Sequence, residues 1–375
     1  MLVEVQPKIT EQIAPSPILQ QTAYWAKVKE EHGYQTKAFD IKIKATENEL
    51  PSLNTGNPPT DDILIVLRQV SPEFQIAYVP YGPVFEPGEE NRGLYLEELS
   101  ESIRKYLPKS CIAIRYDLVW ESPWAGDEAH YNQNGEWIGP PETRIQEMRM
   151  NFDTQGWKLR KAHTNTLPSN TVFMDLNKKD ETLLTQMKSK TRYNIRLSQR
   201  KGVQVEDVTH DNLPVWYNLY QETALRNGIV LDNMEYFKSV LEAQEQQPKQ
   251  WAQIRMLLAK KDDEPLAGMF LAITGKRATY LYGASSNRKR NLMAPYALQW
   301  EAICQAKAAG CEEYDMFGVS DKPDTEHPMY GLYKFKTGFG GELHHRHGCW
   351  DYPLDPKTYE LYRAVEMSGQ GFHMN

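Results

Sequence analysis

The sequence has few cysteines, no long apolar run and no excess of positive charge. Its 375 residues include four cysteines, none of them in a Cys-x-x-Cys arrangement. Sparse, unpaired cysteines argue against a disulfide scaffold and indicate a reducing compartment. The longest clean aliphatic run, residues 63–67, is far shorter than the roughly 20 residues that a transmembrane helix needs. No basic region followed by an apolar segment opens the chain, so we expect a cytoplasmic protein.

The charge balance is mildly acidic, and the composition is that of an ordinary globular protein. The formal net charge is −7, with 40% hydrophobic and 25% charged residues. This balance excludes a surface coated with positive charge for indiscriminate nucleic-acid binding, but it is compatible with a local basic groove. Because 375 residues exceed what one hydrophobic core usually serves, we expect two domains.

Residues 278–341 contain the most informative order of elements. A strand over 280–284 leads through a basic turn at 287–291 into a helix over 295–309. The helix opens with a proline, which suits a first turn because its missing N–H has no helical partner there. Gly310 supplies the left-handed stop, and a short strand follows. The order is therefore strand, charged turn, helix, strand.

Two parts of this stretch are candidate ligand sites. The turn at 287–291 holds three consecutive cations just before a helix N-terminus, which itself carries partial positive charge and free N–H donors. An anion site is one interpretation, and a solvated basic turn is the other. Lys336 lies between Phe335 and a run of glycines, where the backbone can approach a ligand closely. An ordinary turn would give the same pattern.

A second basic region lies in a helix that we predict over residues 179–201. Its segment 188–201 contains six cations and no acid. Cations four residues apart on a helix form one stripe and repel one another, so an anionic partner such as RNA phosphate would stabilise them. The alternative is a solvated helix face whose acids come from elsewhere in the fold. The stripe consists of Lys188, Arg192, Arg196 and Arg200.

Five short motifs, in this order, resemble the Fem (FemABX) aminoacyltransferases, which are tRNA-dependent enzymes that add amino acids to the stem peptide of peptidoglycan precursors. The resemblance covers about residues 17–365. Residues 202–251 contain no extended heptad pair, which indicates a compact FemX-like form without the coiled-coil arm. The motifs are WAKVK at 25–29, YGPV at 81–84, TRYNIR at 191–196, APY at 294–296 and FKTGF at 335–339.

The element order and the resemblance together predict the fold. Each half runs from a helix through strands and a charged turn to a helix and a final strand. We therefore expect an α+β protein of two tandem GNAT-like (acyl-CoA N-acyltransferase-like) domains, with mixed sheets flanked by helices. The first domain is predicted over 1–166 and the second over 167–344. Residues 345–375 return to the first domain, as in the family, and 1–16 are expected to form an irregular arm.

The resemblance also implies roles for individual residues. Asp232 departs from the family, because some members have a phosphate-binding arginine there, and Arg226 is one cation that could replace it. The implied catalytic residues are Lys336, Phe335 and Asp117. The implied substrate-binding residues are Lys29, Tyr236, Tyr280 and Tyr282, and the candidate tRNA-binding residues are Lys188, Arg192, Arg196, Arg200, Arg288 and Arg290.

Each of these roles has a plain structural alternative. Lys29 could be an ordinary exposed helical lysine. Tyr280 and Tyr282 lie two apart on a predicted strand, so their rings should share a face, and paired aromatic residues on a strand often belong to a core. Asp117 ends a predicted strand after Arg115, and the two could form a structural ion pair.

The implied reaction is attack by a substrate amine on the ester of an aminoacyl-tRNA. The Lys336 ammonium could stabilise the oxyanion of the tetrahedral intermediate. No general base is assigned, and no cofactor is expected. The transferred residue would be glycine, alanine or serine, and the acceptor UDP-MurNAc-pentapeptide or lipid II. We expect a monomer that can contact the inner face of the membrane.

Three other functions need to be weighed. A coenzyme A acyltransferase needs a glycine-rich turn before the central helix, and residues 288–293 contain no glycine. A non-catalytic tRNA-binding protein would share the basic regions. A metal site could use His345, His347 and Cys349, which alternate on one strand, but nearby residues of one strand rarely supply a complete set of metal ligands.

Overall fold

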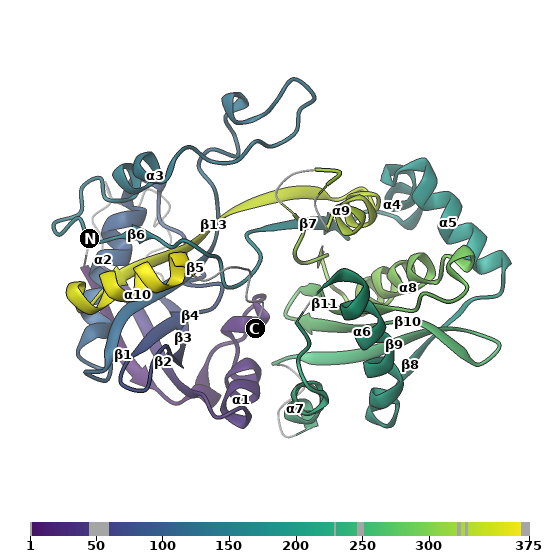
Figure 1. Ribbon diagram of the computed structural model, residues 1–375, viewed down its shortest axis with the longest axis horizontal. Helices are drawn as coiled ribbons and strands as arrows, with labels where there is room; N and C mark the ends of the chain where they lie inside the picture. Colours follow the sequence, from purple (N-terminus) through teal and green to yellow (C-terminus); the bar gives the residue numbers. More distant parts are fainter. Residues whose placement is uncertain are drawn as a thin grey trace. The chain divides into compact units, whose positions relative to one another are not determined.

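The structure is a computed structural model that describes residues 2–44, 60–228, 230–245, 251–320, 324–326 and 329–368. The chain divides into two compact units (Figure 1). The first contains residues 1–14, 20–169 and 345–374, and the second contains residues 15–19 and 170–344. Within the described residues, no helix combines the length and the apolar character needed to cross a membrane.

The first unit is built on a mixed sheet. The strands are antiparallel neighbours except for the parallel pair β4–β5, and β6 adds to β13. In sheet order they are β1 (Leu2–Lys8), β2 (Gln35–Lys44), β3 (Thr60–Gln69), β4 (Gln75–Val79), β5 (Cys111–Glu121) and β13 (Glu342–Pro353), with β6 at Arg160–Lys161. The helices are α1 (Ala23–Glu31), α2 (Arg92–Arg104), α3 (Thr143–Met150) and α10 (Pro356–Ser368).

The prediction of an irregular arm at 1–16 is wrong for its first half. Strand β1 pairs with β2 along its whole length, from Leu2 opposite Lys44 to Lys8 opposite Ala38. Val3 and Val5 alternate into the core of the first unit, where burial of apolar side chains holds the strand in place. Two alternating valines beside a proline are too short a pattern to be recognised as a strand from sequence.

The second unit contains another mixed sheet, in which only the pair β11–β12 is parallel among the described pairs. Its strands in sheet order are β7 (Asn170–Asp175), β12 (Glu313–Asp315), β11 (Arg277–Ser285), β10 (Glu264–Thr274), β9 (Gln253–Lys261) and β8 (Gln204–Val208). The helices are α4 (Asp180–Gln186), α5 (Ser189–Arg200), α6 (Leu213–Asn227), α7 (Met234–Glu245), α8 (Ala294–Ala308) and α9 (Tyr330–Thr337).

Apolar side chains cover both faces of this second sheet. Helix α8 packs on the face that carries Leu257 and Leu271. Trp216 of α6 and Phe237 of α7 pack against Phe270 on the opposite face, with ring centroids 4.5 and 6.0 Å from it. The two sheets and their helices confirm the predicted α+β class with mixed sheets flanked by helices.

The predicted helix over 179–201 is in fact two helices. Met187 and Lys188 adopt extended conformations, with ψ of 151° and 144°, between α4 and α5. The backbone N–H of Lys188 donates to the carbonyl of Gly338 at 2.9 Å instead of to a helical carbonyl. A contact distant in sequence therefore interrupts the helix. Strand β8, which lies between α5 and α6 in the chain, was not predicted.

Candidate functional site

Lys336 lies in the last turn of α9 and is only 4% exposed. Its Nζ donates to the carbonyl of Gly318 at 2.7 Å and lies 5.1 Å from the ring centre of Tyr280. The glycines that follow it are required by close packing. A Cβ on Gly338 would lie 2.5 Å from Thr191 Oγ1, and one on Gly340 would lie 2.5 Å from the Gln186 carbonyl. The glycine run thus fits against the α4–α5 junction.

The surroundings of Lys336 lower its pKa. Burial favours the neutral amine and lowers the pKa to about 7, while the negative charge of Asp315 opposes this shift. Asp315 is itself 4% exposed and accepts hydrogen bonds from the Thr171 hydroxyl and from the backbone N–H of Phe317, the latter at 2.7 Å. Asp315 therefore fixes the chain segment that presents the Gly318 carbonyl to Lys336.

Phe317 has a left-handed backbone, with φ of 58°, which is a costly conformation for a bulky residue. Sequence reasoning missed Asp315, Phe317 and Gly318 as a unit. The available signal was the run DMFG at 315–318, directly after a short strand and between two other predicted site elements. Phe335 packs beside Lys336 in an aromatic group, 5.1 Å from Tyr296 and 5.2 Å from Phe339.

The prediction that Tyr280 and Tyr282 share one strand face is wrong. Phe270 pairs with Tyr282 and Leu271 with Tyr280, because a β-bulge at this point of β11 shifts the register by one residue. Tyr280 therefore lies on the α8 face with Leu271 and beside Lys336. Tyr282 lies on the other face with Phe270, 5.1 Å from Phe237.

Tyr236 and Tyr282, both predicted to bind substrate, are brought together in the second unit. Their hydroxyls lie 2.8 Å apart, and their rings meet edge to face at 6.2 Å. Arg226 donates to the Ser285 carbonyl at 3.0 Å and to Asn287 Oδ1 at 2.9 Å. Arg226 thus ties the end of α6 to the turn that precedes α8.

This basic turn is only partly available to an anion. Arg288 and Lys289 pair with Glu264 at 3.1 and 2.6 Å. Arg290 begins a short 3-10 helix, is exposed, and has no ion-pair partner among the residues described. Lys289 and Met293, on either side of that helix, have left-handed φ values of 47° and 56°. The turn therefore presents Arg290 while acids balance its neighbours.

The structure confirms only part of the predicted stripe of exposed cations on α5. Lys188 precedes the helix, so it is not part of a helical stripe. Arg192 is half-buried and donates to the carbonyls of Thr185 and Met187, so it satisfies free acceptors at the end of α4. Arg196 and Arg200 remain on the exposed surface of α5.

Asp117 lies in the first unit, within β5 and not at its end. It is fully buried and accepts hydrogen bonds from the Tyr78 hydroxyl at 2.9 Å and the Leu167 N–H at 2.8 Å. Its Oδ1 has no hydrogen-bond partner in the described part of the chain. Burial raises the pKa of this carboxyl, and the hydrogen bonds oppose the shift.

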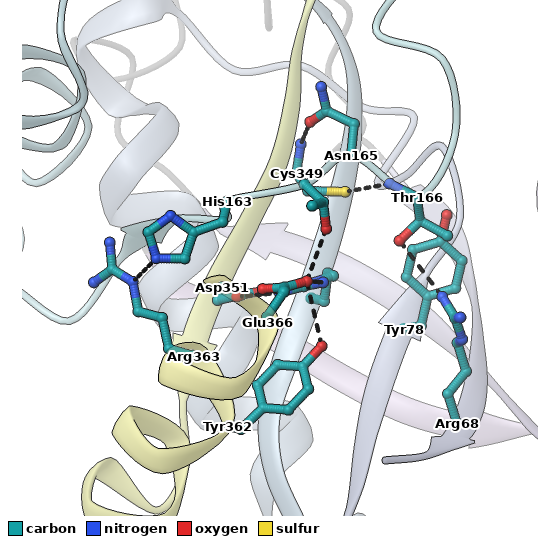
Figure 2. A network of polar contacts seen from close by, with 12 residues as sticks. Arg68, Tyr78, His163, Asn165, Thr166, Cys349, Asp351, Tyr362, Arg363 and Glu366 are labelled. Carbon is teal, nitrogen blue, oxygen red and sulfur yellow. Dashed lines mark hydrogen bonds and ion pairs between the residues drawn. The ribbon is translucent and has the colours of Figure 1, made fainter. Parts of the chain in front are cut away.

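The suggested ion pair of Asp117 with Arg115 is absent from the described contacts. Arg115 instead binds Asp351 at 2.7 Å and Glu366 at 2.6 Å. Figure 2 shows both acids, with the Tyr362 hydroxyl donating to Glu366. Lys29, also in this unit, is half-buried and lies 5.0 Å from the ring centre of Trp25 and 5.7 Å from that of Tyr34. Lys29 is therefore held by aromatic rings and is not an ordinary exposed lysine.

No group of histidine, cysteine or acidic residues in the described ranges is arranged to hold a metal. His345 stacks on Trp137 at 4.4 Å, and His347 Nε2 lies 2.9 Å from the Arg92 guanidinium. A cavity of about 390 Å³ near β1 and β2 is lined by none of the predicted site residues.

Comparisons with known proteins agree with one family. The model of the FemAB family matches residues 11–250 and 244–367. A lipid II:glycine glycyltransferase of Staphylococcus epidermidis is 25% identical over 274 residues, which is 58% of this chain and 66% of that protein. The chain therefore spans just under two thirds of that relative. One of Staphylococcus haemolyticus is 22% identical over 413 residues, 94% of this chain and 92% of that protein.

Among solved structures, the crystal structure of FemX matches with a TM-score of 0.72 at 18% sequence identity, covering 96% of this chain and 100% of FemX. This match confirms the predicted fold over nearly the whole chain.

Proposed function

Because the chain belongs to the FemAB family, we propose that it is an aminoacyltransferase that moves an amino acid from aminoacyl-tRNA to an amine of a peptidoglycan stem peptide. Glycine is the first candidate donor and lipid II the first candidate acceptor, because the matched relatives carry the name lipid II:glycine glycyltransferase. The observation that carries the proposal is Lys336, a buried amine with one hydrogen-bond acceptor and a pKa lowered to about 7.

In the proposed reaction, the neutral amine of the stem peptide attacks the ester carbonyl carbon. A C–N bond forms and the carbonyl oxygen becomes an oxyanion, which the Lys336 ammonium stabilises with a proton not used by Gly318. The intermediate collapses, the bond to the ribose oxygen breaks, and the proton from the attacking amine ends on that oxygen. No side chain is needed as a permanent proton acceptor in this scheme.

The donor's phosphates would bind exposed cations of the second unit. Arg196 and Arg200 of α5, Lys188 before that helix and Arg290 before α8 are all exposed. A protein with a net charge of −7 that still presents these cations is suited to a local RNA contact. Lys29, Tyr236 and Tyr282 remain our candidates for contacts to the acceptor, and Asp117 for a buried polar contact.

The direct test is transfer of radiolabelled glycine from charged tRNA. Purified protein is mixed with glycyl-, alanyl- or seryl-tRNA and with lipid II or UDP-MurNAc-pentapeptide, and product is counted after separation. We expect label on the peptide with glycyl-tRNA and none with free glycine. Turnover with acetyl-CoA alone, or no transfer from any charged tRNA to either acceptor, would refute the proposal.

A further inference from the structure

A group of large apolar side chains is exposed on the first unit, on α3 and the loop that follows it. Ile145, Met148 and Phe152 lie at i, i+3 and i+7, so they follow one side of the helix and its last turn. They are 46%, 52% and 62% exposed, and Trp157 in the loop is 52% exposed. Gln146 and Met150, by contrast, are buried. We call these four exposed residues the α3 surface.

The loop that presents Phe152 and Trp157 is firmly held. The side chain of Asn151, fully buried, donates to the Leu159 carbonyl at 2.9 Å and accepts from the Leu159 N–H at 3.0 Å, which closes the loop. The carboxylate of Glu97 on α2 accepts the N–H groups of Gln155 and Gly156 at 2.6 and 2.8 Å. The exposure of the aromatic rings is therefore a feature of a defined loop.

The backbone at Trp157 supports the same conclusion. Its φ is 49°, a left-handed conformation that bulky residues rarely adopt. The Arg160 guanidinium donates to the Trp157 carbonyl at 2.7 Å and so helps to hold it. A strained residue held in this way with its ring half in solvent suggests a function for the ring, since burial would be the ordinary place for tryptophan.

The charge around the α3 surface favours an anionic partner. Residues 142–161 contain five cations and three acids, and of the five cations Arg149 pairs with Glu89 and Lys158 with Glu101. Arg144 and Arg149 lie on α3 itself and are exposed. Tryptophan and phenylalanine flanked by arginine and lysine are typical of surfaces that lie at the boundary of a lipid bilayer.

We propose that the α3 surface docks on an anionic lipid bilayer, with Phe152 and Trp157 entering the headgroup region. This inference deepens the proposed function, because a lipid-linked acceptor such as lipid II must be reached at the membrane. Apolar rings that leave water and cations that approach lipid phosphates would both contribute to binding.

The test uses vesicles of phosphatidylethanolamine and phosphatidylglycerol that contain no peptidoglycan precursor. We expect the full chain to sediment with these vesicles, and less so at high salt. Phe152→Ser combined with Trp157→Ser should weaken binding by about tenfold or more. The control is Leu361→Ser with Val365→Ser on α10, whose side chains are 71% and 68% exposed. This pair should bind like the unchanged protein.

Three results would overturn the proposal: no sedimentation of the unchanged protein, equal binding by the Phe152/Trp157 variant, or equal loss in the control. Dimerisation that the Phe152/Trp157 variant abolishes, without vesicle binding, would assign the surface to a second copy instead. Transfer to soluble UDP-MurNAc-pentapeptide is measured in parallel and should be unchanged in the variant. Loss of transfer to both UDP-MurNAc-pentapeptide and detergent-solubilised lipid II in every sample, with vesicle binding intact, would refute the proposed function and leave the docking surface standing.

Discussion

Arg115 in the first unit and Lys336 in the second are both buried cations, and their surroundings differ. In the first unit, Arg115 makes two-pronged contacts to Asp351, at 2.7 Å each, and to Glu366, at 2.6 and 2.9 Å. Burial alone would lower the pKa of Arg115, but these partners raise it well above its usual value. In the second unit, the one hydrogen-bond acceptor of Lys336 among the residues described is the Gly318 carbonyl, and burial lowers the pKa of Lys336 to about 7.

The difference is the one we expect between a structural cation and the proposed catalytic one. A buried charge that is matched by hydrogen-bonded acids contributes to a fixed fold, whereas an unmatched one costs free energy unless a ligand completes its environment. Perturbed amines in such settings are frequent at reactive sites. This contrast supports our proposal that Lys336, unlike Arg115, meets negative charge that arrives with the substrate.

The largest effect that we expect is the loss of stability on replacing Arg115, the cation that is paired with acids. Arg115→Met removes the cation that binds both Asp351 and Glu366 and leaves the charge of the buried Asp351 uncompensated, so it should lower the free energy of unfolding by about 3–5 kcal/mol. The change would be measured by urea denaturation. Arg104→Met removes a partner of the more exposed Glu101 and should cost at most about 1 kcal/mol. Equal effects of the two variants would mean that the buried network is no more important than a surface pair.

Lys336→Met should instead lower the rate of transfer and leave the protein folded. Because methionine keeps the length and packing but removes the charge, kcat for transfer should fall about 10²–10³-fold while the fold is retained. Lys334→Met, on the same helix but exposed, is the matched control and should transfer normally. Normal transfer by Lys336→Met would remove Lys336 from the mechanism.

The pH dependence of stability gives a second measure of Lys336. Its pKa is about 7 in the folded chain against an ordinary value of 10.5, so the unfolded chain binds more protons between these values. The stability contributed at this site therefore rises with pH from about 7 to 10.5 and is lowest below 7. Lys336→Met should be most stabilising relative to the unchanged protein at low pH, and the advantage should shrink across this window. A constant difference would contradict the lowered pKa.

Asp315→Asn should have a smaller effect on transfer, and it should shift the pH profile of kcat/KM. Loss of a merely structural residue would not shift that profile. The Asp315 charge opposes the lowering of the Lys336 pKa, so its removal should lower that pKa further. If the ammonium form is active, the alkaline limb of the kcat/KM profile moves to lower pH, and transfer at neutral pH falls by about tenfold. Thr171→Val removes a hydrogen bond to Asp315 but no charge, and should leave that limb in place.

The sequence predicted the strand at 280–284 and the helix at 295–309 well, and they correspond to β11 and α8. It also selected Lys336 as a candidate because of the glycines beside it, and the role of Lys336 stays a prediction. It missed features that depend on distant contacts. Packing of Gly338 and Gly340 against the α4–α5 junction interrupts the predicted helix there, and strand pairing places the bulge that separates Tyr280 from Tyr282.

The sequence also could not show that Arg192 contacts the end of α4, and this contact leads to the smallest effect that we expect. From their four-residue spacing we predicted that Arg192, Arg196 and Arg200 all bind RNA. Among the described contacts, only Arg192 of these three reaches the carbonyls at the end of α4. Arg196→Glu with Arg200→Glu should therefore raise KM for charged tRNA several-fold, with little change in stability, and the effect should fade as salt is added. Arg192→Gln should instead lower the free energy of unfolding by about 1 kcal/mol, because it weakens the hydrogen bonds to the end of α4. KM for charged tRNA should be nearly unchanged, because Arg196 and Arg200 remain exposed. If KM responds to Arg192→Gln but not to the double variant, then the RNA lies along the α4–α5 junction and the distinction between matched and unmatched cations fails on this helix.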